Sequence, residues 1–132
     1  MKNLLFLGLI ICFFSSCIEK IDTKAMANTK WELSELPGMT LPTTSKATLN
    51  IADSLKIGGK SFCNSYGGQG EIVDNKLALK NIFGTKMFCQ DTDAAERSYL
   101  QALNQVNNAK IIDGKLHLLL EDKTLLVFTK VN

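Results

Sequence analysis

The chain has 132 residues, of which 45% are hydrophobic, and a formal net charge of +2. This length fits one domain with a single core, since domains commonly run ~100 to 150 residues, and it leaves no room for a second domain. The near-neutral charge and the lack of a Lys/Arg block or basic stripe in the sequence argue against nucleic acid as a partner.

The first residues have the pattern of an export signal. Residues 4–14 (LLFLGLIICFF) form an apolar run behind the single positive charge of Lys2. The run is shorter than the ~20 apolar residues that a membrane-spanning helix needs, but it fits the ~7 to 15-residue apolar region of a secretory signal. The sequence therefore predicts that residues 1–16 are a signal peptide and that the rest of the chain is exported.

The junction after this run resembles the lipobox of bacterial lipoproteins, in which small residues precede a cysteine that is acylated and becomes the mature N-terminus. Here Ser15 and Ser16 precede Cys17, although Phe14 replaces the usual leucine. The alternative is an ordinary cleaved signal with a free Cys17, which is disfavoured because a lone thiol is a liability in an oxidising compartment. We expect a lipid on Cys17 to anchor the protein in the cell envelope, in the outer membrane or a periplasm-facing membrane, because two or more acyl chains give stable membrane binding.

Residues 18–28 (IEKIDTKAMAN) are polar and are predicted to be a tether. If extended, these residues could reach ~35 to 40 Å and hold the domain clear of the lipid headgroups. The expected organisation is therefore a lipidated cysteine and tether over residues 17–28, followed by one domain over residues 29–132.

Short alternating segments predict strands in the first half of this domain. The segment TKWELSEL (29–36) carries the only tryptophan, Trp31, which we expect in the core rather than at a ligand site. The segments ATLNI and LKIGG, separated by residues 52–54, predict one hairpin. GEIV and KLALK, on either side of Asp74-Asn75, predict another.

A cluster of glycines, Gly67, Gly68 and Gly70, lies between these hairpins. A phosphate-binding loop would continue with Lys-Ser/Thr and open a helix, and neither signal follows here. We therefore expect these glycines to occupy tight turns and bulges.

The pattern changes to a helical period over residues 93–106. Asp93 and Glu96 have the spacing of a capping box. The residues that line one face of this predicted helix are Tyr99, Leu100, Leu103 and Val106.

The remaining segments AKIID, KLHLLLE and TLLVFTKV predict a three-stranded meander, with turns at Asp113-Gly114 and Asp122-Lys123. The apolar runs LHLLL and LLVF are typical of central strands. The predicted fold class is α+β, a curved, mostly antiparallel and barrel-like sheet of seven or eight strands with one main helix.

Two cysteines remain once Cys12 is removed with the signal and Cys17 carries lipid. An even pair in an oxidising compartment predicts a disulfide between Cys63 and Cys89. A cysteine nucleophile would need a histidine base, and the only histidine, His117, lies in an alternating strand segment. A zinc site would need about four ligands and a redox site a CxxC motif, so we expect no catalytic residue, metal or cofactor.

Several motifs, taken in order, resemble the META domain family, whose members include HslJ-like heat-shock lipoproteins. They are Trp31, then GGKSFCNSYGG, then TKMFC, then Glu96 with Tyr99 and Leu103, then IIDGKLHLLLEDKTLLVF, and they cover about residues 29–130. Phe62 and Phe88 depart from the small residues that usually precede the two motif cysteines. The resemblance implies a small α+β envelope domain, linked in some members to stress or antibiotic tolerance, and implies no known catalysis.

The resemblance also groups Asn64, Tyr66, Gly68, Thr85 and Met87 with the two cysteines in one locus. We expect Asn64 and Thr85 to satisfy backbone groups around the disulfide, as short polar side chains do at turns. The alternative is a ligand site, which would need convergent polar groups in a pocket.

The expected function is that of a non-enzymatic envelope lipoprotein that binds a protein or another envelope component and supports stress tolerance. The alternative is an inhibitor or small-ligand carrier of the lysozyme-inhibitor or lipocalin-like type, and an enzyme ranks third. A deep apolar cavity would favour the carrier, and a protruding loop with a polar or charged residue would favour the inhibitor. A flat, packed sheet would favour the binding module.

Overall fold

The computed structural model describes residues 20–132 and contains one antiparallel sheet of eight strands in the order β5-β4-β3-β2-β1-β8-β7-β6. The predicted signal peptide and Cys17 lie outside the described residues. The strands are β1 (Thr29–Glu35), β2 (Thr48–Ile51), β3 (Lys56–Lys60), β4 (Ser65–Val73), β5 (Lys76–Gly84), β6 (Asn108–Ile112), β7 (Lys115–Leu120) and β8 (Lys123–Val131). Two helices, α1 (Thr23–Met26) and α2 (Asp93–Gln105), complete the described chain.

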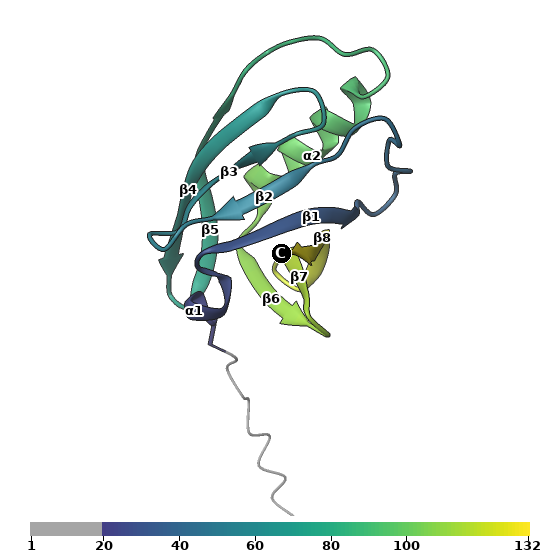
Figure 1. Cartoon of the computed structure of the whole chain (residues 1–132). Coiled ribbons are helices and arrows are strands. Elements are labelled where there is room, and N and C mark those ends of the chain that lie inside the picture. Colours follow the sequence, from purple (N-terminus) through teal and green to yellow (C-terminus); the bar gives the residue numbers. More distant parts are fainter. Residues whose placement is uncertain (1–19) are drawn as a thin grey trace, which may run out of the picture.

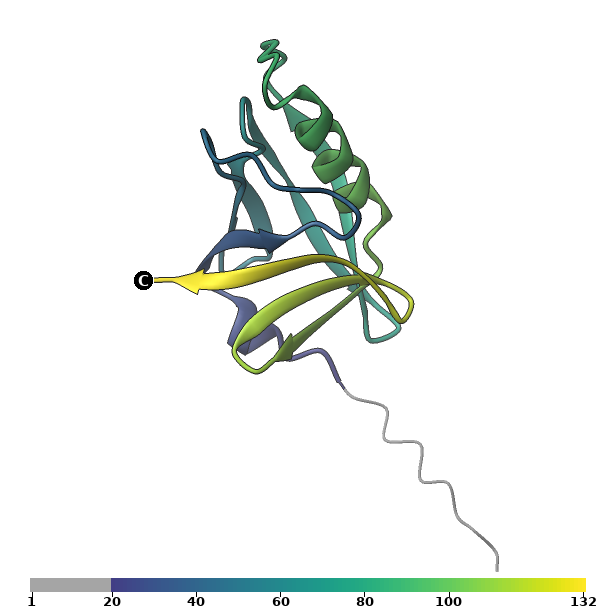
Figure 2. The ribbon, with the colours of Figure 1, turned by 90° about the vertical axis from the view of Figure 1, so that its right-hand side faces the viewer.

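The sheet curls on itself into a half-closed barrel, and α2 lies along the opening between its two end strands (Figures 1 and 2). The first and last strands, β1 and β8, pair with each other in the middle of the sheet. The predicted α+β class and barrel-like sheet with one main helix are therefore confirmed. Among the described residues, no helix is long and apolar enough to cross a bilayer.

The core lies inside this curl and follows the predicted alternation. Trp31 is 2% exposed, and its indole Nε1 donates to Thr29 Oγ1 at 2.6 Å, so its assignment to the core is confirmed. The central position of β7 and β8 is also confirmed. Their inward side chains Leu116, Leu126 and Phe128 are fully buried.

Two of the predicted hairpin turns have the backbone that their residues favour. Asp74 and Asn75 both have positive φ, and so do Asp113 and Gly114, as a two-residue turn between twisted antiparallel strands requires. The last turn differs from the prediction because β8 already begins at Lys123 and the turn includes Glu121, whose φ is 52°.

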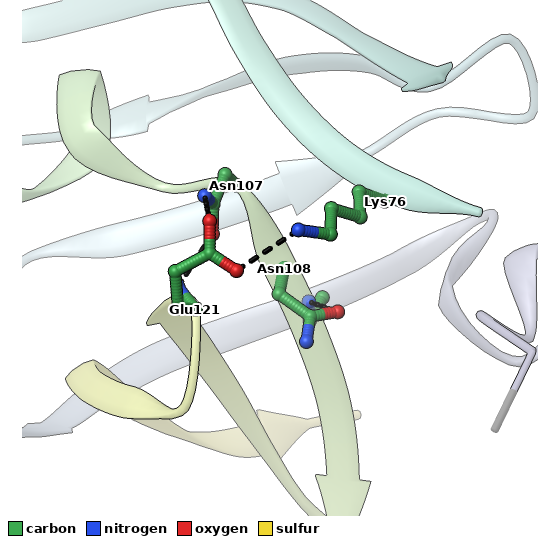
Figure 3. Close-up of polar contacts among 5 residues, drawn as sticks. Lys76, Asn107, Asn108 and Glu121 are labelled. Atoms are coloured by element: carbon green, nitrogen blue, oxygen red, sulfur yellow. Dashed lines mark hydrogen bonds and ion pairs between the residues drawn. The ribbon is translucent and has the colours of Figure 1, made fainter. Parts of the chain in front are cut away.

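Glu121 follows the last residue of β7 and lies at a seam between the two end strands of the sheet, β5 and β6 (Figure 3). Its carboxylate accepts from Lys76 Nζ at 2.9 Å and from Asn107 Nδ2 at 2.8 Å, and its N–H donates to Asn107 Oδ1 at 2.6 Å. Lys76 begins β5 and Asn107 precedes β6. These contacts therefore join the opposite edges of the sheet and help to close the barrel.

The glycine cluster does not form the predicted tight turns, since all three residues lie within β4. The predicted bulge is present, because the pairing of β4 with β5 shifts register between Gly67 and Gln69. Close packing explains the glycines. A Cβ on Gly67 would lie 2.9 Å from the Phe83 ring, and one on Gly68 would lie 2.7 Å from Ile82 Cδ1.

Residues 21–28 of the predicted tether (18–28) belong to the folded domain, which begins before residue 29. The Asp22 carboxylate accepts from the N–H groups at the start of α1. Ile21 N donates to Asn75 Oδ1 at 3.1 Å, and Met26 is 2% exposed within the core. A single buried methionine in a polar stretch produces no periodicity, so the sequence pattern did not reveal this helix.

Candidate functional site

A disulfide joins the β3–β4 connection to the segment that precedes α2. The Cα atoms of Cys63 and Cys89 lie 5.9 Å apart, and the predicted bond between these residues is present. Cys63 therefore has no free thiol in this structure and cannot act as the nucleophile considered in the sequence analysis.

The Asn64 side chain clamps the segment after β5. Its Oδ1 accepts from Met87 N at 2.7 Å and from Thr85 Oγ1 at 2.9 Å. Its Nδ2 donates to Met87 O at 3.0 Å and to Glu96 Oε1 at 2.5 Å. Asn64 is 4% exposed, and these four bonds use its whole hydrogen-bonding capacity.

Thr85 completes this clamp between β4 and the segment after β5. Its Oγ1 accepts from Ser65 N at 3.2 Å, and its N–H donates to Ser65 O at 3.0 Å. The structure thus gives Asn64 and Thr85 backbone partners beside the disulfide, as the sequence analysis expected.

Glu96 holds the other side of the same network and was not predicted to do so. Its Oε2 accepts from the N–H groups of Cys63 at 3.0 Å and Asn64 at 3.2 Å. The predicted capping box is wrong, because the Glu96 carboxylate bonds to Cys63 and Asn64 and the N-cap residue, Thr92, makes no side-chain cap bond. Glu96 lies three positions before the buried Tyr99, so an acid on the apolar face of the helix was the available signal.

The predicted locus divides into two layers. Tyr66 lies on the core side, where its hydroxyl is 2.8 Å from Tyr99 Oη and donates to Thr48 O at 2.9 Å. Burial raises the pKa of both Tyr66 and Tyr99, so both phenols stay neutral near physiological pH. Gly68 sits in the β4 bulge and packs against Ile82 rather than joining the clamp.

A groove of about 590 Å³ opens beside the clamp, between the end of β5 and α2. Three of its lining side chains are apolar and largely exposed: Phe83 at 69%, Met87 at 62% and Phe88 at 75%. We call these three residues the apolar ridge. The backbone of Met87 is fixed by Asn64 while its side chain faces solvent, so the ridge stands on a rigid base.

The polar groups of the clamp bond to one another and to nearby backbone groups. His117 lies in β7 with a half-buried side chain, and its Nδ1 has no hydrogen-bond partner. Over residues 20–132, no group of three or more His, Cys, Asp or Glu side chains could hold a metal ion. The arrangement is suited to holding an apolar surface in place.

One cavity lined by core side chains is very small. Its lining includes Met26, Leu49 and Leu118, and its volume of about 10 Å³ is about the size of one water-sized probe. A second surface groove, of about 520 Å³, lies between α1 and β6 at the other end of the molecule.

Comparisons with known proteins agree on family and fold. A family model described as META domain matches residues 24–132. One similar solved structure is described as an NMR structure of the protein from Burkholderia xenovorans. It is 26% identical, covers 83% of this chain and 86% of its own, and has a TM-score of 0.68.

A second, described as an NMR structure of the protein, is 16% identical, covers 83% of this chain and 94% of its own, and has a TM-score of 0.65, which shows the shared fold. No curated protein matches the chain.

Proposed function

We propose, from the premise that this chain belongs to the META domain family, that it is a non-enzymatic, lipid-anchored module of the cell envelope that binds a protein partner through the apolar ridge. We further propose, from its resemblance to HslJ-like lipoproteins, that this binding supports stress or antibiotic tolerance. The lipid anchor is the one predicted on Cys17.

The exposure of the apolar ridge carries this proposal. Two phenylalanines and a methionine, 62% to 75% exposed, line one groove. Contiguous exposed apolar side chains mark interaction sites, and aromatic residues and methionine are enriched at protein interfaces. The Asn64 clamp and the disulfide hold the supporting backbone, which lowers the ordering cost of association.

The position of the apolar ridge suits an anchored protein. The connection from β5 to α2, which carries Met87 and Phe88, lies at the end of the molecule opposite α1 (Figures 1 and 2). Cys17 precedes the first described residue, Lys20, by three positions. A lipid on Cys17 would therefore place α1 toward the membrane and the apolar ridge toward a partner in the aqueous phase.

Two features bear on the alternative functions. The core cavity of about 10 Å³ gives no support to a lipocalin-like carrier. The protruding segment that carries exposed Lys86 is the feature an inhibitor would use. We expect the mature protein to leave lysozyme activity unchanged in a cell-wall lysis assay, and inhibition that is lost in a Lys86→Ala variant would favour the inhibitor.

Membrane fractionation tests the anchor. We expect the Cys17→Ala variant to leave the membrane fraction for the soluble fraction, because the acyl chains would have no attachment site. If this variant stays as firmly bound to membranes as the wild type, the lipid anchor is wrong.

Cross-linking from envelope extracts tests the apolar ridge. The full-length protein is compared with a Met87→Ser/Phe88→Ser variant and with a matched Leu120→Ser/Val131→Ser variant, since Leu120 and Val131 are also exposed apolar residues. We expect the apolar ridge variant to lose a discrete cross-linked partner that the control keeps. Equal capture by all three proteins would contradict binding through this surface.

A further inference from the structure

We infer that the end of the molecule beside α1 docks on the surface of the bilayer, with two hairpin ends inserted among the lipid headgroups. This inference rests on the lipid anchor of the proposed function, and it assigns a membrane-contacting surface to the domain itself. It concerns the end opposite the apolar ridge.

Four of the exposed large apolar residues of the described chain lie at two hairpin ends. Ile72 and Val73 precede the Asp74-Asn75 turn and are 37% and 53% exposed. Ile111 and Ile112 precede the other turn and are 40% and 44% exposed. We call these four residues the rim.

The rim surrounds the point where the described chain begins. The ends of β4 and β6 lie at the same end of the molecule as α1 (Figure 1). Ile21 N donates to Asn75 Oδ1 at one hairpin, and the groove of about 520 Å³ separates α1 from β6 at the other. Within their hairpins, Ile72 pairs with buried Leu77 and Ile111 pairs with buried Leu116, so these two residues continue the inward face of the barrel to its edge. Val73 and Ile112, the next residues along each strand, lie on the outer face at the same edge.

The length of chain outside the structure decides what covers the rim. Only three residue steps separate Cys17 from Lys20, so the two Cα atoms lie at most ~11 Å apart. The headgroup layer on each side of a bilayer is itself about 5 to 8 Å thick. An acylated Cys17 at the base of this layer therefore keeps the rim within or directly above the headgroups.

Folding of α1 is what shortens this connection. An extended segment from residue 18 to residue 28 would hold the domain clear of the membrane, as the sequence analysis expected. Residues 21–27 are instead held against the domain, since Met26 is buried and Ala27 N donates to Thr23 O at 2.9 Å. The expectation that the domain stands clear of the headgroups is therefore replaced by contact.

Apolar insertion rather than charge accounts for the docking. Exposed charged residues around the rim balance in sign: Lys20, Lys24, Lys115, Asp22, Asp74 and Asp113, together with the ion pair of Lys76 and Glu121. Apolar side chains on an interfacial element enter the boundary between headgroups and acyl chains to a depth of ~5 to 10 Å. The docking should therefore occur on zwitterionic phosphatidylcholine and change little with salt.

The test uses the full mature lipoprotein in phosphatidylcholine vesicles with brominated acyl chains, which quench tryptophan. An Ile112→Trp variant places the probe on the rim, and a matched Phe88→Trp variant places it on the apolar ridge at the opposite end. The only native tryptophan, Trp31, is 2% exposed and gives both proteins the same background. We expect brominated lipid to quench the Ile112→Trp emission roughly twofold or more and the Phe88→Trp emission hardly at all.

A second measurement requires no substitution on the rim. Hydrogen exchange is compared between the acylated wild type on vesicles and the soluble Cys17→Ala protein, and the vesicles should slow exchange in residues 110–116 but not in residues 85–90. The docking is overturned, even if the protein is acylated, if brominated lipid quenches both probes equally. It is also overturned if the vesicles slow exchange equally in residues 110–116 and in residues 85–90. Loss of the anchor is detected separately, because the wild type then fails to fractionate with membranes.

Discussion

Asn64 fixes the backbone of Met87, one of the three residues of the apolar ridge, with a single side chain. It is bonded at once to the backbone of Met87, to Thr85 and to the Glu96 carboxylate, and it is almost fully buried. A buried network of this kind is costly to leave half satisfied, because each orphaned group keeps its desolvation penalty. Binding through the ridge should therefore depend on Asn64, although Asn64 itself is not exposed.

An Asn64→Asp substitution tests this network with almost no change of shape. It places a second carboxylate beside Glu96 Oε1, now 2.5 Å from Asn64 Nδ2. We expect a loss of about 3 kcal/mol or more at about pH 7, and a smaller loss at about pH 4, where protonation of one carboxylate relieves the repulsion. Urea unfolding at both pH values measures it.

The matched control is Asn64→Ala, which removes all four side-chain hydrogen bonds of Asn64 without adding charge. This variant should lose about 1 to 3 kcal/mol at both pH values. Equal losses for the two variants at neutral pH would mean that Glu96 does not sense the charge at this position.

The buried phenols predict how the protein responds to alkali. The chain has only two tyrosines, Tyr66 and Tyr99, and burial raises the pKa of each above the ordinary value of 10.0. Above that value the unfolded chain ionises while the folded protein does not, so stability should fall as the pH rises past 10.0. Absorbance of tyrosinate at about 295 nm should appear together with unfolding, and tyrosinate formed in the folded protein would contradict the prediction.

Helix α1 shows at the scale of elements how a very short segment can belong to the core. Its four residues contribute one buried side chain, Met26, which lines the small core cavity of about 10 Å³. The hydroxyl of Thr29 donates to the Met26 carbonyl, which joins α1 to β1. Removing this side chain should therefore lower the free energy of unfolding of the whole domain.

We expect Met26→Ala to reduce that free energy by about 2 to 4 kcal/mol, through lost burial and an enlarged cavity. The matched control on the same helix is Lys24→Ala, an exposed change that should stay within about 0.5 kcal/mol. Chemical denaturation of both variants gives the comparison. If Met26→Ala unfolds like the wild type, residues 21–28 are a tether after all.

The seam between β5 and β6 responds to pH within a defined window. A hydrogen bond from Lys76, followed by one from Asn107, lowers the pKa of the Glu121 carboxyl below its ordinary value of 4.5. The hydrogen bond to Glu121 raises the pKa of Lys76 above 10.5. Ionised Glu121 therefore stabilises the closed seam above about pH 4.5, and this stabilisation is lost in more acidic solution. Protonated Lys76 stabilises the seam up to about pH 10.5.

Amide protection at the start of β6 measures this effect. We expect protection factors of residues 107–110 to fall between about pH 5 and about pH 3 in the wild type but not in Glu121→Gln. Lys80→Ala is the control, because Lys80 pairs with Glu71 on the adjacent strand and does not bridge the edges. An equal fall in the Glu121→Gln variant would assign the change to another group.

The elements that local signals specify were predicted, and those that depend on distant partners were not. Alternation and the turn pairs Asp74-Asn75 and Asp113-Gly114 are properties of neighbouring residues, so they predicted the hairpins. Glu96 has the spacing of a capping box, but its carboxylate instead bonds to groups 32 and 33 positions away. Met26 and Glu121 likewise owe their positions to contacts with residues far away in the sequence, and no local pattern identifies those contacts.

The whole molecule has one core between the two ends to which we assign binding surfaces. The apolar ridge and the rim lie at opposite ends of the barrel (Figures 1 and 2). The buried cluster between them contains residues from both helices and from all eight strands, including Met26, Leu103 and Phe128. A change at either end should therefore act on one cooperative unfolding transition.

The disulfide gives the clearest test of this coupling. It closes a separation of 26 residues at the apolar ridge end, which is worth roughly 3 kcal/mol by constraint of the unfolded chain. We expect a Cys63→Ser/Cys89→Ser variant to unfold in a single transition with Tm lowered by on the order of 10 °C. Because Asn64 and the disulfide fix the same segment, the losses of unfolding free energy caused by Asn64→Ala and by removal of the disulfide should not add in the combined variant. Calorimetry that shows two transitions, or an unchanged Tm, would mean that the apolar ridge end melts apart from the core.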